Sequence, residues 1–344
     1  MAATSIGQFP AWNPEIANSP QVSVAGTPPS GTVVLVSSGI DSTICADMYP
    51  EAKLLFVDFG QAEVRLERAA VRRLFRGRDL HEVMLRAPMA KGADGTFVPA
   101  RNLLFACLAV QLGNEVVIGA MADDRSVDKT PEALRAMERI LSDQAGFPVR
   151  VTAPLLGKLK YEAVADYLEG AKSRDEASAR LRSTWSCYGP GPRRCLRCKA
   201  CLRWSVALIV NGVDVLLPSD AVIRGYLARL HLYEHGRRWS ILAAIRRRRP
   251  VAIVDLDGTI TKAPNGRDYA DAEIDKDAFE ALRSLAANHW VVIYTARPER
   301  DRSTTTDWLA RHGIVYHALV MDKMPCDKLY DDKAATDFSN VVRS

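Results

Sequence analysis

Short runs of hydrophobic, mostly β-branched residues alternate with segments of helical periodicity along most of the chain. Residues 32–36, 251–254 and 291–294 are typical of buried parallel strands, which are hydrophobic on both faces. Helical patterns cover residues 103–112, 125–141, 160–182 and 221–232. This alternation predicts an α/β protein with parallel sheets.

Composition changes divide the chain into three parts. Residues 1–30 are rich in Pro, Ser, Gly and Thr, which predicts a flexible arm. At about 100–200 residues per domain, the remaining length predicts two domains. We expect two Rossmann-like domains with parallel sheets, at 31–245 and 246–344, with the helices of 206–245 as a tail or bridge.

Charge and hydropathy are those of a soluble globular chain, with 48% hydrophobic and 25% charged residues and a net charge of +5. The excess is partly local: basic residues cluster at 193–203 and 237–249. Such clusters suit nucleic acid, but a solvated face or assistance in binding ATP explains them equally well. No apolar run of about eighteen residues predicts a membrane span, and free thiols without a leader pattern predict the cytoplasm.

Four of the seven cysteines lie within fifteen positions, at Cys187, Cys195, Cys198 and Cys201. Their C-x7-C-x2-C-x2-C spacing lets thiolates converge on one tetrahedral ion, which predicts a structural zinc site. Cys45 and Cys107 fall in apolar helical stretches and are expected in the core.

The first predicted strand leads into a loop of small residues, Ser37-Ser38-Gly39-Ile40-Asp41-Ser42-Thr43, and then a helix. Small residues let backbone N–H groups approach an anion, and the helix N-terminus favours negative charge. No Gly-Lys-Ser/Thr closes the loop, so it is not a Walker loop.

Together with this loop, three further segments resemble the QueC family of 7-cyano-7-deazaguanine synthases over residues 31–210. They are Val57-Asp58-Phe59-Gly60-Gln61, Val98-Pro99-Ala100-Arg101-Asn102 and Thr184-Trp185-Ser186-Cys187-Tyr188 with the cysteines that follow. The resemblance implies an ATP pyrophosphatase domain with a zinc site. It also implies adenylation of the carboxylate of 7-carboxy-7-deazaguanine, followed by attack of ammonia to give the amide and then the nitrile.

The resemblance also assigns roles to residues. Ser37, Gly39, Asp41 and Ser42 would bind the pyrophosphate of ATP, with Asp41 near Mg²⁺ or the helix start. Catalytic roles fall to Arg101 and Lys160, with Lys158 as the rival lysine and an ordinary helix-start arginine as the alternative for Arg101. The remaining ATP-binding positions are Asp58, Gly60 and Gln61.

Two departures from the family leave the acceptor amine open. Ser38 stands where the family has a second glycine, and Lys129 stands at the position of a cysteine, after Asp124 and Asp128. Three outcomes therefore stay open. The reaction stops at an amide, it reaches the nitrile, or it joins the acid to a protein amine. QueC-like proteins occur in antiviral defence operons, which favours a protein acceptor.

The second half resembles phosphatases of the haloacid dehalogenase-like (HAD) family over residues 250–341. Asp255-Leu256-Asp257-Gly258-Thr259 follows a strand, and Thr295-Ala296-Arg297-Pro298, Met321-Asp322-Lys323 and Tyr330-Asp331-Asp332 come in family order. The resemblance implies that Asp255 attacks phosphorus and Asp257 acts as acid and base. Thr295 and Lys323, with Lys328 as its rival, hold the phosphoryl group. The Mg²⁺ ligands are Asp255, Asp257, Asp331 and Asp332.

Only about thirty residues separate the first two of these motifs, so we expect an open site for a bulky phosphate. Two other functions remain open for the chain: a tRNA-modifying thiolase using the same ATP loop, and a zinc-bearing interaction module with a dead ATP site. A homodimer is a further expectation.

Overall fold

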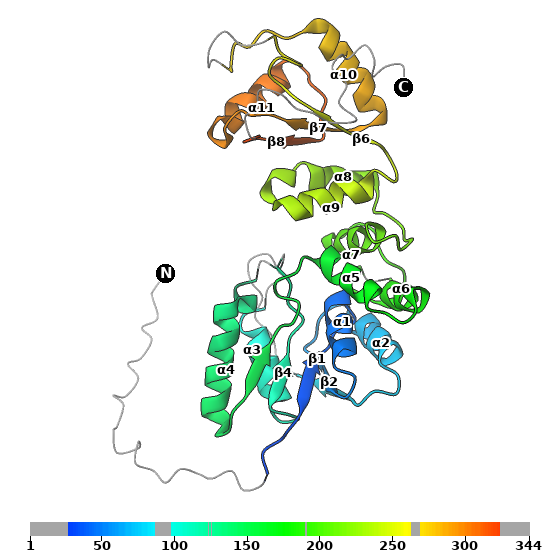
Figure 1. The fold of residues 1–344 in the computed structure, drawn as a ribbon, viewed down its shortest axis with the longest axis vertical. Coiled ribbons are helices and arrows are strands. Elements are labelled where there is room, and N and C mark those ends of the chain that lie inside the picture. The colour runs from blue at the N-terminus through cyan, green and yellow to red at the C-terminus, as the bar shows by residue number, and fades with distance from the viewer. Residues whose placement is uncertain are drawn as a thin grey trace, which may run out of the picture.

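The computed structural model describes residues 27–86, 98–122, 124, 126–189, 191–262 and 269–323. Figure 1 shows two α/β units at the ends of an elongated molecule, with helices between them. Most of the expected arm at 1–30 lies outside the described residues.

The first unit is built on a five-stranded sheet in the order β3-β2-β1-β4-β5, and each neighbouring pair is parallel. The central strand β1 pairs through Val34 with Leu54 on one side and Val117 on the other. The chain order reverses between β1 and β4, which is where open α/β sheets bind ligands. The strands are β1 (Thr32–Leu35), β2 (Lys53–Asp58), β3 (Leu80–Met84), β4 (Glu115–Val117) and β5 (Arg150–Thr152).

Helices cover both faces of this sheet because its central strands are hydrophobic on both sides. Val34 and Phe56 face one core, with α1 (Ile40–Met48), α2 (Val64–Leu74), α5 (Lys160–Glu169), α6 (Arg174–Ser183) and α7 (Lys199–Ile209). The opposite core contains Val33 and Leu55, with α3 (Arg101–Ala109) and α4 (Pro131–Ala145). The expected parallel α/β architecture is thus observed.

The second unit contains a three-stranded parallel sheet in the order β6-β7-β8, formed by β6 (Val251–Val254), β7 (Trp290–Tyr294) and β8 (Ala318–Val320). Side chains alternate between two cores. Val291 and Leu319 pack with α10 (Lys276–Asn288) and α11 (Arg302–Arg311), while Trp290 and Val320 pack on the other face.

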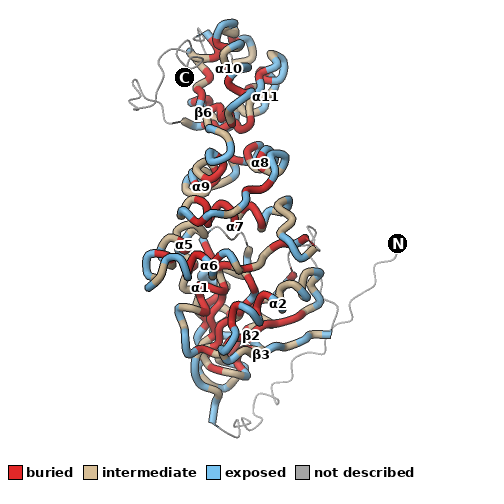
Figure 2. Tube along the Cα trace, turned by 90° about the vertical axis from the view of Figure 1, so that its right-hand side faces the viewer, coloured by how far each residue is buried: buried red, intermediate tan, exposed pale blue. Residues whose placement is uncertain are grey.

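That other face is covered by α8 (Asp220–Leu227), the 3-10 turn η3 (Leu230–Leu232) and α9 (His235–Ile245), and the same core reaches Leu202 and Val206 of α7. Figure 2 shows buried residues in these helices, between the two sheets. One hydrophobic core therefore continues from the last helix of the first unit to the sheet of the second.

Several predicted helices have different bounds. The helix expected over 160–182 is two helices: Gly170 follows the end of α5, and Ser173 caps the start of α6 by accepting a hydrogen bond from the Glu176 N–H. The helix expected from residue 125 begins only at Pro131, after a 3-10 turn η2 (Val127–Lys129). The pattern at 221–232 resolves into α8 and η3.

Two arginines of the basic run 246–249 are engaged inside the molecule. Arg248 donates to the Leu217 carbonyl at 3.1 Å and pairs with Asp220 at 3.1 Å. Arg249 donates to the Ala286 carbonyl at 2.7 Å. They hold segments of the fold together, which weakens this run as a nucleic-acid patch.

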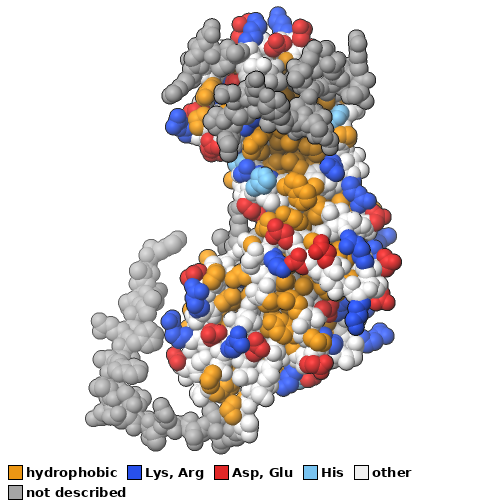
Figure 3. Space-filling view, in the orientation of Figure 1, with side chains coloured by type: hydrophobic (Ala, Val, Ile, Leu, Met, Phe, Trp, Pro, Cys, Tyr) orange, Lys and Arg blue, Asp and Glu red, His pale blue; other side chains and the backbone are white. Residues whose placement is uncertain are grey.

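On the face shown in Figure 3, basic and acidic side chains are interspersed around exposed hydrophobic ones. Cys107 is exposed on α3, so its expected core position is wrong, whereas Cys45 is buried as expected. Among the helices that the structure describes, none is both long and apolar enough to cross a membrane.

Candidate active site

The predicted phosphate loop connects β1 to α1 and is held by its own hydroxyls. Ser42 Oγ donates to the Ser37 carbonyl at 2.8 Å and accepts from the Ser37 N–H at 3.1 Å. Helix α1 begins at Ile40, so its first N–H groups, which have no intrahelical acceptors, open at this loop. The geometry suits a bound anion.

Ser38, which replaces a family glycine, is fully buried and joins the loop to the segment before the cysteines. Its Oγ donates to the Trp185 carbonyl at 2.6 Å, and the Trp185 N–H donates to the Ser38 carbonyl at 2.5 Å. The hydroxyl that departs from the family pattern therefore forms part of the connection between these two segments.

Asp41 and Lys160 form an ion pair between the first turns of α1 and α5. Their side chains are only 20% and 14% exposed. The rival Lys158 pairs instead with Asp166, where both side chains are about half exposed. Of the two lysines, Lys160 is the one that the fold brings to the phosphate loop.

Asp58, Gly60 and Gln61 lie where β2 ends. Asp58 accepts from the Gly60 N–H at 3.0 Å, and Gly60 has φ +80°, a conformation that favours glycine. Asp58 also forms an ion pair with Arg68 of α2. The Gln61 amide donates to Glu67 at 2.8 Å, while burial raises the pKa of the Glu67 carboxyl. The Asp58 and Glu67 carboxylates at this strand end are thus fixed in position by Arg68 and Gln61.

Lys129, at the position of a family cysteine, reaches Asp124 at 2.7 Å, and Arg203 of α7 reaches the same carboxylate at 3.2 Å. Burial opposes ionisation of Asp124, but the two cations outweigh it and hold its pKa below the ordinary range. Asp128 instead accepts from Ser126. The Asp124 carboxylate thus lies between Lys129 of the altered segment and Arg203 of α7.

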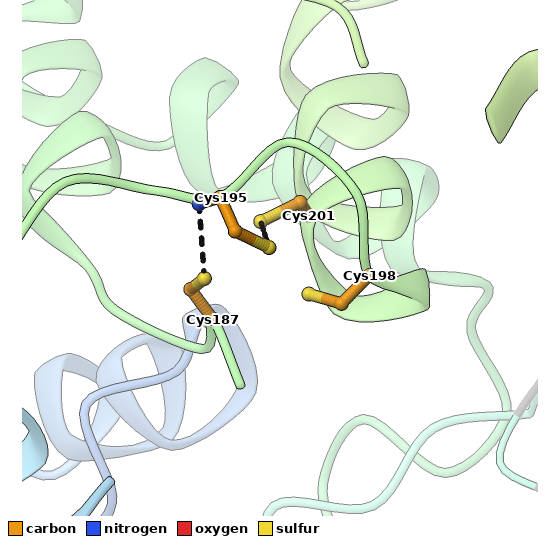
Figure 4. Close-up of side chains that lie close together, drawn as sticks. All are labelled: Cys187, Cys195, Cys198 and Cys201. Atoms are coloured by element: carbon orange, nitrogen blue, oxygen red, sulfur yellow. Dashed lines mark hydrogen bonds between the residues drawn. The ribbon is translucent and has the colours of Figure 1, made fainter. Parts of the chain in front are cut away.

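The four cysteines converge as the spacing predicts, and Figure 4 shows their sulfurs directed toward a common point. Their sulfur atoms all lie within 4.8 Å of one another, and the Sγ atoms of Cys195 and Cys201 are 3.9 Å apart. A tetrahedral ion with Zn–S bonds of about 2.3 Å sets sulfurs about 3.8 Å apart. The donor set and its dimensions fit zinc.

Backbone geometry holds these sulfurs in place. The N–H groups of Gly189 and Cys195 both donate to Cys187 Sγ at 3.2 Å. A Cβ on Gly189 would lie 2.8 Å from that of Cys195, so only glycine fits there. A hydrogen bond from the Cys201 thiol lowers the pKa of Cys198 to about 4, which favours a thiolate.

These parts surround one cavity of about 790 Å³ above the carboxyl ends of β1, β2 and β4. Eight of the nine residues predicted for the phosphate loop, the β2 end and catalysis in the first domain line its wall: Ser37, Gly39, Asp41, Ser42, Gly60, Gln61, Arg101 and Lys160. The ninth, Asp58, is the last residue of β2 and is not a lining residue. Trp185 and Tyr188 extend the wall toward the cysteines.

The cavity wall also contains Lys129 and two residues that the sequence did not single out for chemistry, Glu67 and Arg203. The cysteines are not among its described lining residues, and burial raises the pKa of Cys45 to about 12. A reactive thiol is therefore missing from the described wall, which disfavours the thiolase alternative.

A second cluster lies where β6, β7 and β8 end. Lys323 Nζ lies 3.0 Å from Asp255, and Thr295 Oγ1 lies 3.4 Å from Asp257. The buried Arg297, which sequence analysis did not assign a role, binds Asp257 through two nitrogens at 2.9 and 2.7 Å. Asp331, Asp332 and the rival Lys328 lie outside the described residues.

Comparisons with known proteins place the first unit. The family model described as queuosine biosynthesis protein QueC matches residues 78–212. A 7-cyano-7-deazaguanine synthase of Anaeromyxobacter sp. (strain Fw109-5) is 33% identical over 223 residues, 52% of this chain and 91% of that protein.

Two more relatives carry the same name. The protein of Desulfitobacterium hafniense (strain DSM 10664 / DCB-2) is 32% identical over 233 residues, 55% of this chain and 94% of that protein. The protein of Sulfolobus acidocaldarius is 26% identical over 55% of this chain. The match spans about half (48%) of the length of that protein.

Proposed function

Because the chain belongs to the QueC family of 7-cyano-7-deazaguanine synthases, we propose that its large cavity adenylates 7-carboxy-7-deazaguanine with ATP. One observation carries this proposal: the phosphate loop, Arg101 and Lys160 line the same cavity as Trp185, Ser186 and Tyr188. A carboxylate oxygen of the acid attacks the α-phosphorus of ATP, pyrophosphate leaves, and the acyl adenylate forms.

The chain's charges are arranged for this step. Ser37, Gly39, Asp41 and Ser42 hold the departing pyrophosphate, and Lys160 and Arg101 neutralise charge that develops on the phosphates. Asp41 is the loop carboxylate that would hold Mg²⁺, which would screen phosphate charge when bound. Asp58, Gly60 and Gln61 bind ATP where β2 ends. Positioning and electrostatics account for the rate of this step, because the carboxylate must be aligned in line with the departing pyrophosphate although the two groups repel each other.

The cysteine cluster acts as a structural brace in this proposal. Zinc held by Cys187, Cys195, Cys198 and Cys201 would fix the loop that continues into Trp185 and Tyr188 on the cavity wall. All four ligand positions are cysteines, which is the ligand set of closed structural zinc sites.

An amine then attacks the acyl carbon and displaces AMP to give an amide. Tyr188 lines the cavity and is half exposed, so this wall is open to an incoming amine. The amine is ammonia, with a second adenylation leading to the nitrile, or a protein amine that gives a deazaguanine–protein amide.

Mass spectrometry distinguishes these outcomes. The protein is incubated with ATP, Mg²⁺, 7-carboxy-7-deazaguanine and either ammonia or a candidate protein amine. A small-molecule amide or nitrile identifies ammonia as the acceptor, and a mass increase on the protein identifies a protein amine. Recovery of unmodified acid with no AMP would overturn the proposed function.

For the second unit we propose a Mg²⁺-dependent phosphohydrolase of HAD type over residues 246–344. Asp255 attacks phosphorus and forms an aspartyl phosphate, while Asp257 protonates the leaving oxygen and then activates water. Lys323 and Thr295 bind the phosphoryl group, which the contacts to Asp255 and Asp257 support. The Mg²⁺ ligands would be Asp255 and Asp257, with Asp331 and Asp332 from outside the described residues.

A further inference from the structure

A buried side-chain amide on the wall of the large cavity has a donor with no hydrogen-bond partner among the described residues. Asn102, in the first turn of α3, is only 5% exposed. Its Nδ2 finds no hydrogen-bond partner within the described part of the chain, although the residue lines the cavity. Leaving a buried donor unpaired costs about 1–3 kcal/mol, so a ligand acceptor is the expected partner.

A carboxylate and two aromatic rings line the same cavity. Glu67 of α2 contributes to the wall, and the Gln61 amide orients it by donating to Oε2 at 2.8 Å. A carboxylate offers about four lone-pair sites, so Glu67 retains capacity for further donors. The rings of Phe59 and Phe105 lie 5.5 Å apart, and both line the cavity.

These groups lie close together in the fold. Asn102 and Phe105 are three residues apart on α3, so they share one helix face. Phe105 contacts the ring of Phe59, whose N–H donates to Gln61 Oε1 at 3.0 Å, and Gln61 in turn holds Glu67. A donor, a carboxylate and an apolar aromatic wall thus line the same cavity and are linked by short contacts.

We propose that Asn102 and Glu67 recognise the 2-amino-6-oxo edge of a guanine-type base, with Phe59 and Phe105 against its plane. This inference rests on the proposed function and names the subsite for the substrate's base. The Asn102 amide donates to the 6-oxo oxygen, and the Glu67 carboxylate accepts from N1–H and the 2-amino group.

The same groups reject an adenine edge. Adenine presents an amino donor where a guanine-type base presents oxygen, and a lone pair at N1. The first would face the Asn102 donor and the second the Glu67 carboxylate. The subsite therefore separates the base of the acid from the base of ATP within one cavity.

Kinetics with two substrates test this subsite. Pyrophosphate release is measured with 7-carboxy-7-deazaguanine and with the analogue that lacks the 2-amino group. The parent protein is expected to use the analogue about 10- to 100-fold less efficiently in kcat/KM, the effect of one charge-assisted hydrogen bond. Glu67→Gln is expected to lower kcat/KM for the true acid by a similar factor and to lose most of the discrimination.

Matched controls separate recognition from folding. Glu132→Gln makes the same change at an exposed position of α4 and is expected to leave both values unchanged. Asn102→Asp, which replaces the donor by an acceptor, should raise the KM for the acid at least tenfold. If Glu67→Gln and Asn102→Asp keep the parent's discrimination and KM for the acid, the subsite is wrong while the adenylation proposal stands. If the parent shows no acid-dependent pyrophosphate release, both are overturned.

Discussion

At the scale of single residues, Lys158 and Lys160 are two positions apart but occupy different environments. Lys160 pairs with Asp41 at the phosphate loop, while Lys158 pairs with Asp166 in a half-exposed position. We predict that Lys160→Ala lowers kcat/KM for pyrophosphate release at least 100-fold, because a phosphate-neutralising charge is lost. Lys158→Ala is the matched control and should stay within twofold. Equal losses in both variants would remove Lys160 from the proposed site.

Asp255 offers a test that separates the two units. Asp255→Asn removes the nucleophile but keeps the side chain's size, so we predict loss of Mg²⁺-dependent hydrolysis of a generic phosphate ester to below 1% of the parental rate. Pyrophosphate release should be unaffected, because Asp255 belongs to the second unit. Hydrolysis at the parental rate would place the phosphatase site elsewhere.

Spacing predicted the cysteine cluster, and the resemblance to a family implied the roles of the phosphate loop and Lys160, but neither predicted the partners of these groups from other elements. The phosphate loop, Lys160 and the cysteines were predicted, and the fold brings each into the expected neighbourhood. Glu67 and Arg203 were missed because each sits on an ordinary amphipathic helix, and only the packing of α2 and α7 turns them toward the cavity. Arg297 lies within the Thr295–Pro298 motif, but its hydrogen bond to Asp257 forms only in the folded chain, so the motif did not reveal its role.

At the scale of elements, the cysteine loop links the cavity wall to α7. Cys198 caps α7 and Cys201 lies in its first turn, so an ion would fix that helix end to the segment of Cys187. We predict that Cys201→Ser protein holds less than a tenth of the parent's zinc. Its melting temperature should also be about 5–10 °C lower, which corresponds to a loss of about 2–3 kcal/mol in the free energy of unfolding for a chain of this size.

Elemental analysis and thermal melting check this prediction, and Cys107→Ser, an exposed thiol on α3, is the control. Equal zinc content in Cys201→Ser and the parent would show that the cluster is not the metal site.

The contact between α9 and α5 is a second element-scale feature. A Cβ on Gly236 of α9 would lie 2.6 Å from Leu159 Cδ1 and 3.2 Å from the Tyr161 hydroxyl. Lys160 stands between those two residues. We predict that Gly236→Val lowers the free energy of unfolding by about 1–3 kcal/mol, and that it raises the KM for ATP by displacing Lys160.

Gly225 of α8 provides the comparison, because a Cβ there meets nothing within 4 Å. Gly225→Val should change the free energy of unfolding in chemical denaturation by less than about 0.5 kcal/mol. An equal loss of stability in both variants would mean that the close packing at Gly236 is not the cause.

At the scale of the whole molecule, α7 packs against the first sheet through one core and forms a second core with α8, α9 and the second sheet. The periodicity predicted helices at 206–245 but could not assign them to one unit, because a helix buried on two sides contacts whichever sheets the chain places beside it. The structure shows Trp290 and Val320 of the second sheet packed on them. For this reason we expect the two units, each with its proposed activity, to unfold together as one cooperative assembly.

The central claim is that the large cavity activates a 7-deazaguanine acid with ATP. The most direct measurement is exchange of labelled pyrophosphate into ATP by the zinc-loaded chain, with and without 7-carboxy-7-deazaguanine. The account predicts exchange that requires the acid and disappears in Lys160→Ala. Absence of exchange with the acid, or equal exchange with an unrelated carboxylic acid, would contradict it.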